Sequence, residues 1–216
     1  MNCNYCTNTC IKKGIRNSVQ KYHCKSCGKW QQQKYTYRKF ESSEKRNIVS
    51  LTKEGASISS ISRLIKRSKS IIQKQIFLAG KTINKPHYNE YYQDYELDEM
   101  SIKIAGQEDI YLIYAINRTT RKVIDFFIGG RTKENISKVV SAVLCYHPKT
   151  IYTDKLNVYP SLIPKKIHKP GRRLTNRIER KNLSLRNFIK RLSRSTLCFT
   201  RKTDMLEAVI KLVSWA

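Results

Sequence analysis

Four cysteines near the start of the chain have the spacing of a metal site. Cys3 and Cys6 form one Cys-x-x-Cys pair, and Cys24 and Cys27 form a second pair, with seventeen residues between them. That separation is typical of structural zinc sites. A two-residue gap lets a tight turn direct both sulfurs at one ion, and four thiolates complete a tetrahedral shell at about 2.3 Å. We therefore expect residues 1–34 to form a zinc ribbon that folds largely through metal binding.

Other uses of these cysteines fit the sequence less well. Disulfides need an oxidising compartment, of which the sequence gives no sign. A redox Cys-x-x-Cys motif would need a βαβ context, and here there are two such motifs without one. Cys10 and His23 are close enough in sequence to replace one of the four ligands, and this alternative stays open. Cys145 and Cys198, each alone in apolar surroundings, are expected to be core thiols.

Two acidic residues stand out in the most basic part of the chain. Residues 135–203 contain seventeen Lys or Arg but only two acids, Asp154 and Glu179. Asp154 follows an apolar strand expected at 150–153, and ligand-binding groups of mixed sheets tend to lie at such carboxyl ends. A third acid, Asp98, lies within an earlier expected strand. These three carboxylates are the candidates for metal-dependent chemistry.

Three carboxylates could hold two Mg2+ ions. Mg2+ prefers hard oxygen ligands and keeps several waters, so a few carboxylates open to a phosphate suffice. Two ions about 4 Å apart can clamp a phosphodiester, one activating the attacking hydroxyl and the other stabilising the leaving oxygen. The alternative is that Glu179 only pairs with neighbouring arginines. Periodicity cannot separate Asp98 from Glu96, which shares its strand face. Asp94 and Glu99 are further rivals of Asp98.

The charge and composition of the chain indicate which class of molecule it binds. The chain has 216 residues, with 43 Lys or Arg against 16 Asp or Glu, and a formal charge of +27. This imbalance indicates a polyanionic partner, most simply nucleic acid. Apolar residues make up 40% of the chain, enough for a core, which excludes a disordered basic tail. No apolar run approaches the roughly 18 residues of a membrane helix, and the first residues lack the apolar stretch of a signal peptide.

Residues 41–80 have the periodicity of helices. Ser42 or Ser43 can cap a first helix, and Gly55 ends it. A short second helix fits residues 57–66. The side chains expected to face inward on these two helices are apolar: Ile48, Val49, Leu51, Ile58, Ile61, Leu64 and Ile65.

A third helix, capped by Ser68 or Ser70, is expected to reach Leu78. Its inward positions would be Ile71, Ile72, Gln75, Ile76 and Leu78, and its outward positions Lys69, Gln73 and Lys74. A helix, a short helix, a tight turn and a basic-faced helix together resemble a helix-turn-helix, which would place the outward residues on DNA. The alternative is a three-helix packing module with a solvated basic face.

The second half of the chain has a different pattern. Residues 81–93 are expected to be a linker, since Pro86 would break a helix. Beyond them we expect strands over 95–100, 110–116, 122–128 and 150–153 and helices over 132–146, 176–193 and 202–214. An antiparallel meander followed by a helix, a further strand and helices matches the order of a ribonuclease-H-like mixed sheet. We therefore expect a multidomain α+β protein in which residues 94–216 form that domain.

Several segments resemble the DDE transposases of the insertion sequence one (IS-one) family, over nearly the whole chain. They are Cys3-x-x-Cys6, 22–28, Leu97-Asp-Glu-Met100, 111–131, Tyr152-Thr-Asp154 and 176–194. The last of these is the most specific. The interval of 24 residues between Asp154 and Glu179 is also typical of the family.

The resemblance implies a function for each candidate residue. Asp98, Asp154 and Glu179 would be the catalytic, magnesium-binding carboxylates. Arg186, seven residues after Glu179 and on the same helix face, would contact the DNA end. The remaining basic candidates on this helix would contact DNA phosphates: Arg177, Arg180 and Lys181.

The resemblance also implies a reaction and partners. The ribbon and helix-turn-helix would recognise the terminal inverted repeats of an insertion sequence. Water would cleave the phosphodiester at an element end, and the freed 3′-hydroxyl would attack target DNA, with no covalent protein intermediate. The expected partners are double-stranded DNA, as element ends and target, and a second copy of the chain in a homodimer or larger assembly. A cytoplasmic, nucleoid-associated protein of a prokaryote is expected.

Two other functions fit the same residues. One is a DNA-binding regulator built on the ribbon and the helix-turn-helix, with an inactive C-terminal half. The other is a ribonuclease-H-like nuclease that cuts DNA without strand transfer.

Overall fold

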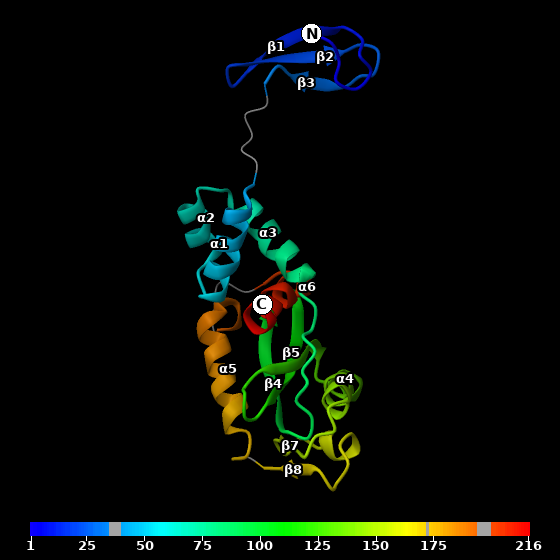
Figure 1. Ribbon diagram of the computed structural model, residues 1–216, viewed down its shortest axis with the longest axis vertical. Helices are drawn as coiled ribbons and strands as arrows, with labels where there is room; N and C mark the ends of the chain where they lie inside the picture. The colour runs from blue at the N-terminus through cyan, green and yellow to red at the C-terminus, as the bar shows by residue number, and fades with distance from the viewer. Residues whose placement is uncertain (35–39, 172, 194–199) are drawn as a thin grey trace. The chain divides into compact units, whose positions relative to one another are not determined.

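The computed structural model describes residues 1–34, 40–171, 173–193 and 200–216 (Figure 1). The chain divides into two compact units, Met1–Glu41 and Ser42–Ala216. The finer division of the second unit into residues 41–80, 81–93 and 94–216 stays a prediction. Within the described ranges, no helix combines the length and the apolar character that a membrane crossing needs.

The first unit is a small antiparallel sheet. Its strands are β1 (Cys10–Arg16), β2 (Val19–Cys24) and β3 (Trp30–Gln32), in that spatial order. Asn17 and Ser18 connect β1 to β2, both with φ in the left-handed region, at 50° and 59°. Two consecutive residues of this kind form the tight turn that matches the twist of a hairpin.

Gln31 links β3 to the N-terminal segment. It is buried in β3, where its side-chain oxygen accepts from the backbone N–H of Asn4 at 2.8 Å. Its side-chain nitrogen donates to the backbone oxygen of Asn2, also at 2.8 Å. A buried amide is stable only with such partners, and here it ties the N-terminal segment to the sheet.

The second unit begins with three helices: α1 (Ser42–Lys53), α2 (Ile58–Ile65) and α3 (Lys69–Thr82). Ser57 and Ser68 cap α2 and α3 by accepting hydrogen bonds from backbone N–H groups. Lys66, with φ of 55°, ends α2. The helices and the tight turn are those expected, except that α3 continues four residues past Leu78, into the expected linker.

Several apolar side chains of these helices are not in the core. Ile48, Ile61, Ile72 and Ile76 are buried as expected, whereas Val49 and Leu51 are half-buried. Three others are exposed: Leu64, Ile71 and Leu78. Ile71 and Leu78 are exposed because α3 packs through a narrow stripe at i, i+4 and i+8, which ends at Gly80.

Gly80 allows α3 to approach the last helix, α6 (Thr203–Trp215), closely. A Cβ atom at this glycine would lie 2.5 Å from both Cα and Cβ of Ala208. The two small residues therefore bring the backbones together, and the helical segment packs directly on the C-terminal part of the unit.

A five-stranded mixed sheet forms the rest of the core. Its strands are β4 (Asp94–Ile104), β5 (Gln107–Asn117), β6 (Val123–Gly130), β7 (Thr150–Thr153) and β8 (His168–Pro170). The spatial order is β6-β5-β4-β7-β8, with β4, β5 and β6 antiparallel and both β7 and β8 parallel to β4. The expected meander is confirmed. β8 was not among the expected strands.

Helices cover both faces of this sheet (Figure 1). On one face, α4 (Lys133–Leu144) packs its valines and Ile136 against Leu97 and Ile113. On the other face, α5 (Asn176–Phe188) lies along β4 and buries Ile178 and Leu185. Residues of β4 therefore alternate between an α4 face, which holds Leu97, and an α5 face.

The end of α5 and the burial of Cys145 differ from the expectations. The helix expected over 176–193 ends at Phe188, because Ile189 leaves the helical region with ψ of 88°, and only a short turn at Lys190–Leu192 follows. Cys145, expected in the core, is exposed because it ends α4 on the solvent side. Cys198 lies outside the described residues.

Candidate functional site

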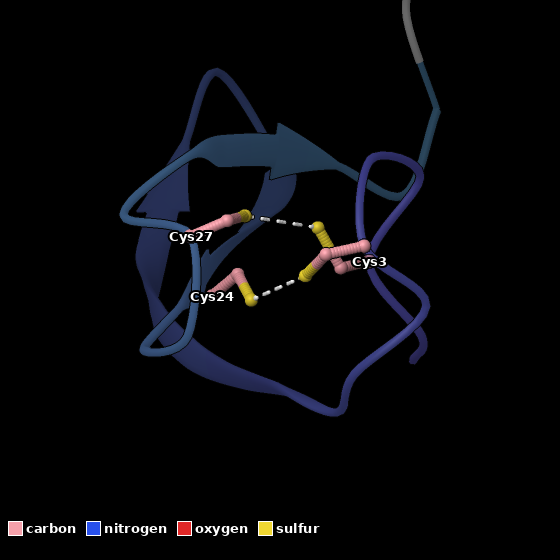
Figure 2. Close-up of side chains that lie close together, drawn as sticks. Cys3, Cys24 and Cys27 are labelled. Atoms are coloured by element: carbon pink, nitrogen blue, oxygen red, sulfur yellow. Dashed lines mark hydrogen bonds between the residues drawn. The ribbon is translucent and has the colours of Figure 1, made fainter.

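The structure brings the four predicted cysteines together. The sulfurs of Cys3, Cys6, Cys24 and Cys27 all lie within 4.8 Å of one another. The Sγ–Sγ distance is 3.5 Å between Cys3 and Cys27 and 3.4 Å between Cys6 and Cys24. A tetrahedral zinc site with bonds of about 2.3 Å has sulfurs about 3.8 Å apart, so the four thiols fit this ion. Figure 2 shows the side chains of Cys3, Cys24 and Cys27 converging from two loops.

The two Cys-x-x-Cys pairs are built alike. The backbone N–H of Thr7 donates to the oxygen of Cys3 at 3.0 Å, and that of Gly28 donates to the oxygen of Cys24 at 2.9 Å. Thr7 and Gly28 each stand four residues after the first cysteine, with φ of 61° and 69°. Each loop thus turns back on itself so that both of its sulfurs face one point.

Cys10 and His23 lie outside this group. Cys10 is buried beside it, and burial raises the pKa of its thiol to about 11, so it stays neutral. By contrast, a hydrogen bond from the backbone N–H of Cys27 lowers the pKa of the Cys24 thiol to about 6. His23 packs its ring on Trp30 at 4.7 Å. Of these six residues, the four predicted cysteines are therefore the ones placed to share an ion.

A second group of possible metal ligands lies where β4 and β7 separate. Their parallel pairing ends at Glu96 and Tyr152. Asp98 and Asp154 each lie two residues beyond that last pair, so the register carries them to the same point. Oxygens of Asp98, Glu99 and Asp154 lie within 4.8 Å of one another. The carboxyl end of a parallel strand is where open sheets bind ligands.

Asp98 lies on the α5 face in a hydrogen-bonded position. The side-chain nitrogen of Asn182 donates to Asp98 Oδ2 at 2.7 Å, and the hydroxyl of Tyr114 donates to Asn182 Oδ1 at 2.7 Å. Burial raises the pKa of Asp98, an effect that the Asn182 hydrogen bond opposes. The charges of Asp154 and Glu179 raise this pKa further.

Glu99 reaches the group from the α4 face. The hydroxyl of Tyr159 donates to its carboxylate, and a guanidinium nitrogen of Arg131 lies 3.2 Å from Glu99 Oε2 and 3.8 Å from Asp154 Oδ2. Burial raises the pKa of Glu99. Strand alternation places Glu99 on the opposite face of β4 from Asp98. That Asp154, at the end of its strand, approaches both acids could not be predicted from the sequence.

Glu179 lies near this group but outside it. Its side chain is exposed on the first turn of α5 and accepts from the hydroxyl of Thr175 at 3.2 Å. Its carboxylate is not among the oxygens that lie within 4.8 Å of one another. It stands three residues before Asn182, on the helix that contacts Asp98, and its role as a metal ligand stays a prediction.

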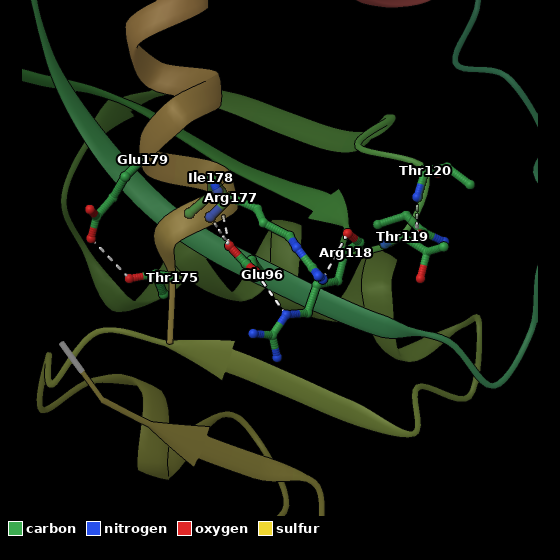
Figure 3. Close-up of polar contacts among 9 residues, drawn as sticks. Glu96, Arg118, Thr119, Thr120, Thr175, Arg177, Ile178 and Glu179 are labelled. Atoms are coloured by element: carbon green, nitrogen blue, oxygen red, sulfur yellow. Dashed lines mark hydrogen bonds and ion pairs between the residues drawn. The ribbon is translucent and has the colours of Figure 1, made fainter. Parts of the chain in front are cut away.

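Glu96, which periodicity could not separate from Asp98, is fully buried and has another function. Its carboxylate accepts from the backbone N–H groups of Arg177 and Ile178, at 3.0 and 2.9 Å, and pairs with Arg118 at 3.0 Å (Figure 3). These contacts occupy it at the start of α5. Asp94, a further rival of Asp98, is the first residue of β4 and pairs with Thr150, the first residue of β7.

The predicted DNA-binding residues differ in exposure. Lys69, Gln73 and Lys74 are exposed on α3. Arg177 and Arg180 are exposed on α5. Lys181 and Arg186 are half-buried, and burial lowers the pKa of Lys181. Burial raises the pKa of the Tyr114 hydroxyl, and Arg186 is close enough for its charge to oppose this shift.

The segment that carries these acids matches a known protein family. The family model of the IS1 transposases matches residues 95–213, which is more than half of the chain. The chain belongs to the IS1 transposase family. The matched segment of this IS1 family chain contains Asp98, Asp154 and Glu179.

Curated relatives agree with this assignment. Insertion element iso-IS1n protein InsB of Shigella dysenteriae is 35% identical over 116 residues, which cover 53% of this chain and 88% of the relative. Insertion element IS1 protein InsB of Shigella flexneri is 33% identical over 106 residues, 49% of this chain and 81% of the relative. A solved chain from a simian T-cell lymphotropic virus intasome in complex with PP2A regulatory subunit B56 gamma is 13% identical, with a TM-score of 0.40. That similarity covers 77% of this chain and 67% of the other.

Proposed function

We propose that this IS1 family chain is a DNA transposase, which binds the terminal inverted repeats of an insertion sequence and catalyses magnesium-dependent cleavage and strand transfer. The observation that carries the proposal is the convergence of Asp98 and Asp154 where β4 and β7 separate. It lies inside the segment that matches the family, in a chain with a formal charge of +27. A cluster of carboxylates in so basic a protein is best explained by a reaction on a bound polyanion such as DNA.

The carboxylates are suited to divalent cations. Asp98 and Asp154 offer hard oxygens, the donors that Mg2+ prefers, and Glu179 would complete the set from α5. When bound, two Mg2+ ions supply Lewis acidity at the scissile phosphate. Asn182 holds one oxygen of Asp98 by a hydrogen bond from its side-chain nitrogen. Arg180 and Arg186 would hold the DNA end by its phosphates.

The reaction would have two steps at phosphorus. In the first, water attacks the phosphodiester at the element end, the P–O3′ bond breaks, and the 3′ oxygen takes up a proton to become a free hydroxyl. In the second, that hydroxyl attacks a phosphodiester of target DNA, and the target's own 3′ oxygen leaves. Each displacement inverts phosphorus and leaves the protein unmodified.

The remaining parts of the chain would recognise and assemble the DNA. The four cysteines would hold zinc, and Lys69, Gln73 and Lys74 would meet an inverted repeat through α3. Because two element ends must react together, we propose a homodimer or larger assembly acting in the cytoplasm on the nucleoid.

A cleavage assay on an oligonucleotide that carries an element end tests the proposal. We expect Mg2+-dependent nicking by the wild type and its loss in Asp98→Ala, Asp154→Ala and Glu179→Ala, while each variant still binds the end. Near wild-type cleavage by any variant would remove that residue from the metal ligands. End binding without any nicking would indicate the regulator, and nicking without joining of a pre-cut 3′-hydroxyl end would indicate a nuclease.

A further inference from the structure

We propose that Glu96 and Arg118 form a positioning pair, which holds the start of α5, and with it Glu179 and Asn182, in register with Asp98 and Asp154. This inference rests on the proposed function, because it concerns the assembly of the same carboxylates. Glu96, which periodicity could not separate from the candidate ligand Asp98, would thus have a positioning function.

Glu96 replaces the N-cap that α5 lacks. Thr175 occupies the N-cap position, but its side chain makes no capping hydrogen bond and instead donates to Glu179. The backbone N–H groups of Arg177 and Ile178 donate to Glu96, a residue of β4 that is fully buried. The first N–H groups of a helix need such an acceptor, and a carboxylate also complements the positive end of the helix dipole. The cap therefore fixes α5 to the strand that carries Asp98.

Arg118 extends the connection to β7. It follows β5, and its Nε lies 3.0 Å from Glu96 Oε1. Its guanidinium lies over the ring of Tyr152, 3.8 Å from the centroid, two residues before Asp154. Its backbone oxygen accepts from the side chain of Arg177 at 3.1 Å. Figure 3 shows Arg118 between Glu96 and the turn that follows β5.

The network thus joins each element that supplies a candidate carboxylate. β4 carries Asp98, β7 leads to Asp154, and α5 carries Glu179. A buried carboxylate is costly unless it is paired and hydrogen-bonded, and Glu96 has both compensations. Loss of the pair would free the first turn of α5 while the apolar contacts of Ile178 and Leu185 still hold the helix on the sheet.

Two variants test the pair. Glu96→Gln removes the charge and keeps the shape, and Arg118→Lys keeps the charge but loses the planar contact with Tyr152. We expect amide hydrogen exchange of Arg177 and Ile178 to become at least about tenfold faster while the amides of β5 stay protected. We also expect the Mg2+ concentration for half-maximal end cleavage to rise about tenfold, as for other residues that orient metal ligands, and excess Mg2+ to restore much of the rate.

Glu90→Gln is the matched control. Glu90 accepts from the side-chain amide of Asn117 and pairs with a basic residue, Lys122, and among the described residues no hydrogen bond or ion pair joins it to α5. It should leave both measurements unchanged. If Glu96→Gln does not fold, Arg118→Lys alone decides. Unchanged exchange at Arg177 and Ile178, or an unchanged Mg2+ requirement with only a lower melting temperature, would overturn the proposal. If the wild type cuts no element end, the proposed function fails, while the exchange measurement still decides whether the pair holds α5.

Discussion

The side-chain amide of Asn182 is held between Tyr114, from which it accepts at 2.7 Å, and Asp98, to which it donates at 2.7 Å. Because the tyrosine hydroxyl donates to the amide oxygen, the amide nitrogen must face Asp98. This hydrogen bond favours the ionised carboxylate and opposes the burial that raises the pKa of Asp98. Asn182 thus favours the ionised form of Asp98, which the proposed metal site needs.

Asn182→Ala should shift the pH dependence of cleavage. Loss of the hydrogen bond raises the already elevated pKa of Asp98 further. Since the carboxylate must be ionised to hold a cation, activity is lost as pH falls through this pKa, and the loss should begin at a higher pH in the variant. Initial cleavage rates between pH 5 and 9 at fixed Mg2+ measure the shift. Asn187→Ala, exposed on the same helix, is the control, and an acid limb that does not move would contradict the role of Asn182.

Asp98→Asn should stabilise the metal-free protein while it abolishes cleavage. The folded-state pKa of Asp98 lies above its unfolded value, so the folded form binds the proton more tightly. Stability is therefore lost as pH rises through these values, and the ionised side chain is a cost at neutral pH. Removal of the charge should raise the free energy of unfolding at pH 7 by about 1 kcal/mol. Urea unfolding with a chelator at pH 7 and pH 4 measures it. A gain that does not shrink at pH 4 would mean that ionisation is not its cause.

The parts of this molecule that depend on local signals could be predicted from the sequence. The spacing of Cys3 to Cys27 identified the sulfur group, because each Cys-x-x-Cys loop folds on its own residues. Ser68 caps α3 as expected, and Ser57 and Thr132 cap α2 and α4 at the expected starts of these helices, since an N-cap needs only a hydroxyl and the next turn. The strands of the meander followed from alternation and turn residues.

Features that depend on register between distant elements could not be predicted. Glu96 and Asp98 share a strand face, and only the position of α5 on that face makes Glu96 a helix cap and leaves Asp98 beside Asp154. Glu99 approaches Asp154 because β7 ends where it does. In the same way, Ile71 is exposed because Gly80, rather than the apolar count of α3, decides which side of the helix packs.

Cys24→Ser should release zinc and unfold the first unit only. Loss of one of four ligands opens the shell on which so small a sheet depends, because metal binding supplies its folding free energy. We expect zinc content to fall from one ion per chain to near zero and affinity for an element end to fall at least about tenfold. Metal analysis and a binding titration measure both. Cys10→Ser, outside the sulfur group, should keep its zinc. End affinity that is unchanged by Cys24→Ser would exclude the ribbon from DNA recognition.

Gly80→Leu should weaken the packing of α3 on α6. Its Cβ would lie 2.5 Å from Ala208, so the helices must separate. Overpacking of this kind costs about 1–3 kcal/mol of folding free energy. Chemical unfolding followed by circular dichroism measures the loss, and Gln73→Ala, exposed on the same helix, should stay within about 0.5 kcal/mol. An unaltered unfolding midpoint in Gly80→Leu would show that the contact between Gly80 and Ala208 is not tight.

Lys74→Ala should reduce the salt dependence of end binding. Lys74 is exposed on α3, the helix proposed to meet the inverted repeat. A lysine that neutralises one phosphate adds about one unit to the slope of log affinity against log salt, so its loss should lower the slope by about that amount for every DNA sequence. Gln73→Ala should instead reduce discrimination between the element end and unrelated DNA, because an amide recognises base edges. Titrations at several salt concentrations separate the two effects. Lys81→Ala, exposed at the other end of α3, is the control for charge alone, and a slope lowered equally by Lys81→Ala would show that α3 contributes only to the general field of the protein.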